Sequence, residues 1–417
     1  MNTQTQSKKA RVIRSGDDLT KRQRLIFILL LGTSMTLMPY SIDPILPSFP
    51  SIGAFFGVAD SAIQFSLTGV TIGFALGQLI TGPLSDALGR RRPMQVAVLL
   101  YVLATVGSAY APNIETFFSA RVLMGVGAAA ATVVASAVIR DLYVGLPMMK
   151  LLSRVFLIQG LAPIFGPLMG SQLLAFLTWQ QILLVFAAYG LLAFFGIRVF
   201  LVETLHTDSR KSSGIKGMAH RFRAVLRDRI YVGLIIFSAL QTIALFAYLN
   251  VTPFLFQDSF KLTAGQFGLF FALNSVFSTI GVQLGARLAV RFRAAWVLFA
   301  HAALAALGGV ALVVAGLAGA EFWLVTSLCA FVVFNFGGTL TPLQSIALAP
   351  HGSEAGTAAS LLGVLNFVSA SLAAPLYAVL DTSNSVAMGA TIAACYGLGL
   401  ASLWFIVRLK TVPALKA

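Results

Sequence analysis

The sequence predicts an all-α integral membrane protein with twelve transmembrane helices arranged as two six-helix bundles. Hydrophobic residues make up 58% of the 417 residues and charged residues only 10%, whereas a soluble globular domain carries about 25% charged residues. The apolar residues fall into about twelve long uncharged runs, each near the roughly 20 residues that a helix needs to cross a bilayer. One polar stretch, residues 203–229, separates six of these runs from the other six.

The runs follow one another through short connections that carry charge, proline or glycine. Continuous apolar runs do not suit a membrane β-barrel, because its strands alternate between lipid-facing and lumen-facing residues. The expected helix centres lie near residues 35, 72, 103, 129, 166, 190, 240, 275, 305, 332, 367 and 396. This divides the chain into a basic tail (1–24), an N-terminal bundle (25–202), a central loop (203–229), a C-terminal bundle (230–407) and a second tail (408–417).

Positive charges occur in every second connection. The first tail and the central loop are rich in Lys and Arg, and Lys261 is the only such residue in the alternate connections, which are 47–60, 112–116, 178–180, 257–264, 317–321 and 380–386. By the positive-inside rule both termini and the central loop face the cytoplasm. The net charge of +15 is explained by this asymmetry, so nucleic-acid binding is not expected.

A charged turn, GPLSDALGRRR, follows the second apolar run at Gly82–Arg92. Asp86 and Arg90 are spaced i,i+4 and can form an ion pair, while Gly82 and Gly89 relax the helical constraints around them. Two interpretations stay open: a contact made in one conformational state only, or a charge cluster that sets topology alone. The second leaves Asp86 without a role.

Only one of the fourteen acidic residues, Asp43, falls within a predicted transmembrane helix. Pro44 and Pro47 follow it and free backbone groups, which are tolerated only against protein or water. An acid in the membrane is costly and indicates a functional site. Burial favours the protonated form of a carboxyl group, as a proton carrier requires. The alternative is that Asp43 caps the end of the helix.

Arg121 is the only cation in the apolar part of the fourth predicted helix. A guanidinium there needs a carboxylate, carbonyl oxygens or water. A purely structural role, in which Arg121 ties helix ends together, is the alternative to a role in transport.

Three motifs resemble those of the major facilitator superfamily. GPLSDALGRRR resembles the loop after its second helix, and RVLMGVGAA, which begins at Arg121, resembles its fourth-helix arginine motif. APIFGPLMG, with Gly166, Pro167 and Gly170, resembles the fifth-helix motif of its antiporters. Shorter stretches, YSIDPILPSFP, RDLY and FAYLNVTPFLFQ, resemble the drug/proton antiporters that include the bicyclomycin and chloramphenicol resistance exporters.

The resemblance implies the major facilitator fold and an exporter of small amphiphilic drugs that works by alternating access. Asp43 and Arg121 would couple export to protons, and the turn with Gly82, Asp86, Gly89 and Arg90 would latch the two halves together. A single membrane acid favours neutral substrates, such as phenicol antibiotics, over strongly cationic ones. Export of an endogenous metabolite shares every motif and stays open. A receptor or an enzyme finds no support, because the sequence shows no catalytic constellation and no P-loop.

In this fold the first, fourth, seventh and tenth helices are the candidates for a substrate cavity. Aromatic rings and scattered amides suit a lipophilic molecule with a few hydrogen-bonding groups. The predicted contacts are Tyr40, Asp43, Phe246, Tyr248, Asn250, Asn335 and Gln344. The expected partners are the bilayer, the substrate and protons. We expect a monomer in a bacterial cytoplasmic (inner) membrane, with no metal and with the proton gradient as the energy source in place of a cofactor.

Overall fold

The apolar runs form helices throughout the part of the chain that the computed structural model describes, which comprises residues 20–143, 146–205, 223, 225–348, 355–372 and 384–412. Most of the predicted basic tail and central loop, together with residues 413–417, lies outside this part. Ten of the described helices are long and apolar enough to cross a membrane, and a shorter apolar helix spans Thr357–Leu372. The predicted fold class is confirmed.

The first half of the molecule precedes the central loop. It contains α1 (Lys21–Tyr40), the 3₁₀ helix η2 (Asp43–Ser48), α2 (Phe49–Phe56), α3 (Asp60–Leu88), α4 (Arg91–Ala109), α5 (Ile114–Leu142), α6 (Leu146–Leu174) and α7 (Trp179–Phe200). The first predicted span is therefore interrupted, because α1 ends before Pro44 and the chain continues as η2 and α2.

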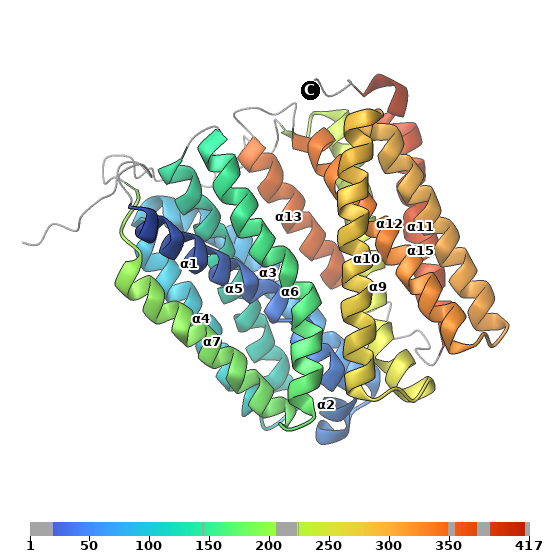
Figure 1. Cartoon of the computed structure of the whole chain (residues 1–417), viewed down its shortest axis with the longest axis horizontal. Coiled ribbons are helices and arrows are strands. Elements are labelled where there is room, and N and C mark those ends of the chain that lie inside the picture. Colours follow the sequence, from blue (N-terminus) through green and yellow to red (C-terminus); the bar gives the residue numbers. More distant parts are fainter. Residues whose placement is uncertain are drawn as a thin grey trace, which may run out of the picture.

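The second half follows the central loop. It contains α9 (Arg229–Phe254), the π-helix η4 (Leu255–Ser259), α10 (Ala264–Arg291), α11 (Ala294–Leu317), α12 (Phe322–Leu348), α13 (Ala355–Leu372), α15 (Val386–Ala401) and its π-helical continuation η6 (Ser402–Val407). In Figure 1 the two halves stand side by side, with α6 and α10 adjacent where they meet.

Local signals in the sequence set where several helices begin. Thr20, Thr178 and Thr263 each form a capping box with a glutamine three residues later, at the starts of α1, α7 and α10. A capping box satisfies backbone N–H groups that a helix start leaves without partners. These helices therefore begin at the polar boundary of their apolar runs.

Glycines let helices within each half approach closely. A Cβ on Gly73 of α3 would overlap the Val122 carbonyl oxygen of α5, and a Cβ on Gly281 of α10 would overlap the Phe334 carbonyl oxygen of α12. Small residues at such crossings are typical of membrane helix pairs. The second and fourth spanning helices of each half thus pack in the same way, as expected if the halves arose by duplication.

The two ends of the bundle can be told apart by their residues. We call the end that carries Arg90 and Arg293 the basic end, and the opposite end, where α2 lies, the α2 end (Figure 1). At the α2 end the halves meet through the rings of Phe49 and Phe254, whose centroids are 6.3 Å apart. There Gln64 Nε2 also donates to the Asn250 carbonyl oxygen at 3.4 Å.

Candidate functional site

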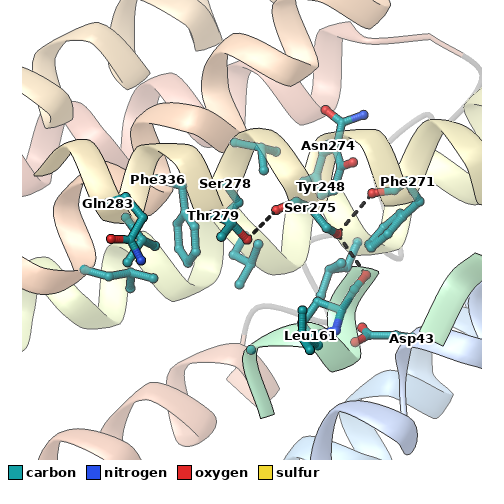
Figure 2. Close-up of a pocket in the computed structure, with 17 residues that line it drawn as sticks. Asp43, Leu161, Tyr248, Phe271, Asn274, Ser275, Ser278, Thr279, Gln283 and Phe336 are labelled. Carbon is teal, nitrogen blue, oxygen red and sulfur yellow. Dashed lines mark hydrogen bonds between the residues drawn. The ribbon is translucent and has the colours of Figure 1, made fainter. Parts of the chain in front are cut away.

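A cavity of about 580 Å³ lies between the two halves. Its lining comes from Asp43 and α6 in the first half and from α9, α10 and α12 in the second (Figure 2). The volume is within the range of sites that bind small molecules. Most of the lining is apolar, with Leu161, Leu249, Phe271 and Phe336 among the contributors.

The polar side chains of the cavity lie mainly on one helix, α10. We call this set the polar wall; it consists of Asn274, Ser275, Ser278, Thr279 and Gln283. Residues three or four positions apart lie on the same side of a helix, so the set follows the cavity along the helix axis. From Phe271 to Gln283 this lining extends over about 18 Å at 1.5 Å per residue.

Burial changes along the cavity. Asp43 is 7% exposed and Phe271 is 4% exposed, whereas Thr279 and Gln283 are exposed. Because α10 runs from the α2 end to the basic end, the cavity is closed near Asp43 and opens toward the basic end. The described conformation therefore gives access from one side of the molecule.

Asp43 is the first residue of η2 and lies at the closed end of the cavity, close to Leu161 in Figure 2. Its Oδ2 atom is buried and has no hydrogen-bond partner, and no side chain caps η2. The capping alternative is therefore not supported. Among the described residues Asp43 takes part in no ion pair. A buried carboxyl group without partners is costly in its charged form.

The glycines of the fifth-helix motif explain how the η2 turn fits against α6. A Cβ on Gly166 would lie 2.9 Å from Asp43 Cβ, and a Cβ on Gly170 would overlap the Pro44 carbonyl oxygen. No other residue type leaves room for the turn at these two positions. Gly166 and Gly170 therefore determine where Asp43 sits, and Pro167 lies between them.

Arg121 is fully buried on α5. Its Nη1 atom donates to Met124 Sδ at 3.5 Å, while Nε and Nη2 have no hydrogen-bond partner. It interacts electrostatically with the phenol of Tyr101, which is also fully buried. In the described part of the chain Arg121 and Asp43 form no ion pair, so the two predicted coupling residues are not in direct contact in this conformation.

The charged turn contains the predicted ion pair. Arg90 Nη1 lies 2.6 Å from Asp86 Oδ1, and Arg90 Nε lies 2.8 Å from Asp141 Oδ2 on α5. Glu203 accepts from the backbone N–H of Arg90 at 2.8 Å and so caps the start of α4. Asp86, Arg90 and Asp141 all belong to the first half, so in this conformation their ion pairs do not join the turn to the second half.

The structure corrects one part of the expected turn geometry. Gly82 lies inside α3, which continues to Leu88, and a Cβ there would meet no atom within 4 Å. Gly89 alone makes the turn, with φ of 90°, a conformation that favours glycine.

We expect Asp86→Asn to leave the protein inserted and folded but to impair transport. Arg90 keeps Asp141 and the Ser85 hydroxyl as partners, so the turn persists, whereas the Asp86–Arg90 pair, which we expect to favour one conformational state over the other, is lost. The measurement is transport at equal abundance in the membrane. Wild-type turnover would leave only the topological role of the turn.

Two of the seven predicted substrate contacts, Asp43 and Tyr248, line this cavity. The other five are placed elsewhere, so those predictions are not supported for this cavity. Tyr40 packs against the rings of Phe186 and Tyr189, with centroids 5.4 and 5.5 Å away. Phe246 is buried outside the cavity.

The three predicted amide contacts have other environments. Asn250 Nδ2 donates to the Phe246 carbonyl oxygen at 2.7 Å. Asn335 Oδ1 lies 2.9 Å from Nδ1 of His301 on α11, while its Nδ2 donates to the Phe331 carbonyl oxygen. Gln344 is exposed on α12 and does not line the cavity. In this conformation Asn250 and Asn335 therefore bond within the helix bundle, and Gln344 lies at the surface.

The sequence prediction missed the polar wall. Its signal is visible in NSVFSTIGVQ, residues 274–283, where polar residues recur at helical spacing inside an apolar run. The prediction considered only the first, fourth, seventh and tenth helices, and α10 is the eighth spanning helix.

The model of the Major Facilitator Superfamily matches residues 26–375. The chain is 33% identical over 381 residues to the uncharacterized MFS-type transporter YdgK of Bacillus subtilis (strain 168), covering 89% of this chain and 92% of that protein. It is 27% identical to the bicyclomycin resistance protein homolog of Haemophilus influenzae, covering 93% of this chain and 97% of the relative. It is 25% identical to the multidrug resistance protein MdtL of Shewanella oneidensis, over 85% of this chain and 89% of the relative.

Solved structures share the fold. A crystal structure of a D-xylose-proton symporter has a TM-score of 0.78 and 15% sequence identity, covering 94% of this chain and 99% of that one. The xylose transporter XylE from E. coli, in a partially occluded inward open conformation, has a TM-score of 0.75 at 15% identity, covering 95% of this chain and 99% of that one. At this identity the likeness concerns the fold alone.

Proposed function

This chain belongs to the Major Facilitator Superfamily, a family of transporters and not of enzymes, and we propose that it is a proton-coupled exporter of small amphiphilic, neutral drugs. The observation that carries the proposal is Asp43, a buried acid without partners at the closed end of a cavity that opens toward the basic end. The names of the relatives, a bicyclomycin resistance protein homolog and multidrug resistance proteins, support drugs as the substrate class.

In the proposed cycle Asp43 takes up a proton when the drug leaves and releases the proton when a drug molecule binds. When the cavity faces outward, the carboxylate takes up a proton and the drug leaves. When the cavity faces inward, the proton is released and a drug molecule binds. The two half-reactions are coupled because the protein changes conformation only in the protonated or in the drug-bound form, which is the condition for uphill exchange. Arg121 supports the cycle as a fixed positive charge that biases the protonation of the acid through the protein interior.

Orientation follows from the charges at the basic end. Arg90, Arg198 and Arg293 are near the ends of helices there, and by the positive-inside rule this end faces the cytoplasm of a bacterial inner membrane. The described cavity then opens to the compartment from which drugs are exported. Fluorescent reporters that mature only in the cytoplasm should be bright when fused to either terminus, and a dark terminus would reject this orientation.

The proposed substrate lies along the polar wall. Apolar residues such as Leu249 and Phe336 contact its lipophilic body, while Ser278, Thr279 and Gln283 supply hydrogen bonds on one side only. A neutral molecule with a row of polar groups, such as a phenicol, matches this division. Export of an endogenous metabolite of the same chemistry is the second candidate, because the cavity cannot distinguish a drug from such a molecule.

A two-part experiment tests the proposal. The protein is expressed in a drug-sensitive host lacking its own exporters and challenged with phenicols, bicyclomycin and strongly cationic dyes; we expect raised resistance to the neutral compounds. The drug with the largest effect is then followed in proteoliposomes with and without an imposed pH gradient. Transport of no compound in the panel would favour the metabolite, and transport that ignores the pH gradient would reject proton coupling.

Gln283→Ala should alter the order of preferred drugs if the polar wall contacts them.

A further inference from the structure

A backbone carbonyl on α6 lacks the hydrogen-bond donor that a regular helix would supply. Pro167 has no N–H group, so the carbonyl oxygen of Pro163, four residues earlier, does not receive the i→i−4 bond of a regular helix. Both prolines lie inside α6. In the interior of a membrane protein a carbonyl oxygen without a donor is costly, because water is scarce there.

The donor comes from the other half of the molecule. Ser275 Oγ on α10 lies 2.9 Å from the Pro163 carbonyl oxygen, and Figure 2 shows this bond beside Leu161. The same hydroxyl lies 3.0 Å from the Phe271 carbonyl oxygen of its own helix. The Phe271 carbonyl has the backbone N–H of Ser275 as its regular helical donor, whereas the Pro163 carbonyl lacks the donor at that position. The single hydroxyl proton of Ser275 therefore has most effect at Pro163.

The surrounding contacts place this bond where the halves pack most tightly. About two helical turns closer to the α2 end, a Cβ on Gly268 of α10 would overlap Ser171 Oγ of α6 and would lie 2.9 Å from the Pro167 carbonyl oxygen. Ser275 and Pro163 both line the cavity, as does Asp43. The bond therefore lies between the closed α2 end and the cavity.

We infer that Ser275 is a positioning residue of the transport cycle: it satisfies the carbonyl that Pro167 leaves open and thereby stabilises the conformation that is closed at the α2 end. When the halves separate there, the Pro163 carbonyl loses its donor. Opening the α2 end therefore costs free energy, because Pro167 has no N–H group to satisfy this carbonyl. Another hydroxyl contact between the halves differs, because the Thr71 and Ser371 hydroxyl oxygens, 2.9 Å apart, contact each other and not a carbonyl that a proline leaves without its donor.

The test is a double-mutant cycle read out by conformation. Spin labels are placed on Tyr110→Cys and Leu317→Cys, which are 72% and 75% exposed at the α2 ends of the two halves. The native buried cysteines, Cys329 and Cys395, are replaced by alanine. Pulsed electron paramagnetic resonance then measures the distances between the labels. The ratio of long to short distances gives the ratio of open to closed α2 ends. No drug and no pH gradient is used, so the result does not depend on the proposed export function.

We expect Ser275→Ala to raise the ratio of open to closed α2 ends by about three- to tenfold, in line with one hydrogen bond and one orphaned carbonyl. Ser275→Thr, which keeps the hydroxyl, should retain the wild-type distances. Ser371→Ala, the matched control, should change the ratio by less than about twofold, since it leaves no carbonyl without a donor.

Pro167→Ala decides the mechanism, because it restores the missing N–H. In the Pro167→Ala background, Ser275→Ala should change the ratio of open to closed α2 ends by less than about twofold. The two substitutions are then non-additive, as expected for residues that act on the same hydrogen bond. An equal effect of Ser275→Ala with and without Pro167, or no effect in either, would overturn the inference. If Ser275→Ala alone fails to fold, recovery of folding in the Pro167→Ala/Ser275→Ala variant supports it and failure of both rejects it.

Discussion

Asp43→Asn is expected to abolish gradient-driven export while leaving the protein folded and able to bind its substrate. The side chain is buried at the closed end of the cavity, and its Oδ2 atom has no hydrogen-bond partner. An amide of the same size can neither take up nor release a proton, so the exchange of a proton for a drug molecule, which couples export to the gradient, is lost. Since the amide is close in size to the carboxyl group, the drug should still enter and bind, but its affinity should no longer depend on pH, because no proton competes with it at this position.

The measurement is drug transport in proteoliposomes with an imposed pH gradient, together with binding to the detergent-solubilised protein. Asp60→Asn is the matched control, because Asp60 is an exposed acid at the start of α3, outside the cavity. It should transport at the wild-type rate. Asp43→Glu should keep partial activity, since the titrating group survives at a shifted position. If the asparagine variant still pumps in response to the gradient, another group couples the proton.

Gly170→Ala is expected to cause the second large loss, by moving the turn that holds Asp43. The added methyl group would overlap the Pro44 carbonyl oxygen, which is backbone and cannot rotate away. Overpacking of this kind destabilises proteins by about 1–3 kcal/mol, and η2 must shift for the variant to fold at all. We therefore expect lower thermal stability and transport that is reduced at equal abundance.

Gly397→Ala provides the control for this prediction. Gly397 lies inside α15, and a Cβ there meets no atom within 4 Å. Alanine favours a helix over glycine by about 1 kcal/mol, so this variant should be as stable as the wild type or more stable, with unchanged transport. Equal behaviour of the two variants would show that close packing between α6 and η2 has no role in holding Asp43.

The placement of Asp43 explains why the first spanning helix is interrupted. A regular helix through Pro44 and Pro47 would lack backbone hydrogen bonds. The chain instead forms the short 3₁₀ helix η2, all of whose residues are buried. α6 accepts this turn through Gly166 and Gly170, and α10 supplies the donor that α6 lacks at Pro163. The fifth-helix motif thus serves two contacts at once, one with the acid-bearing turn and one with the other half.

The sequence by itself determined the helices and the local contacts within them. Length and polarity of the apolar runs decide where a chain crosses a bilayer, because only a helix of about 20 residues satisfies its backbone there. The capping boxes at Thr20, Thr178 and Thr263 and the Asp86–Arg90 pair span three or four residues. Such spacings follow from helix geometry alone. Asp43 could also be identified from the sequence alone, since an acid in an apolar run is rare and costly.

Only the tertiary structure decided which faces of the helices meet. A helix in lipid can be apolar on every side, so its pattern does not tell the cavity side from the lipid side. This is why the amides Asn250, Asn335 and Gln344 were predicted in the cavity and are found elsewhere, while the polar wall of α10 was missed. The contacts between Gly170 and Pro44 and between Ser275 and Pro163 join segments more than 100 residues apart in the chain. They depend on how each helix is rotated and on how closely the backbones approach, and those quantities are set by packing across the whole bundle.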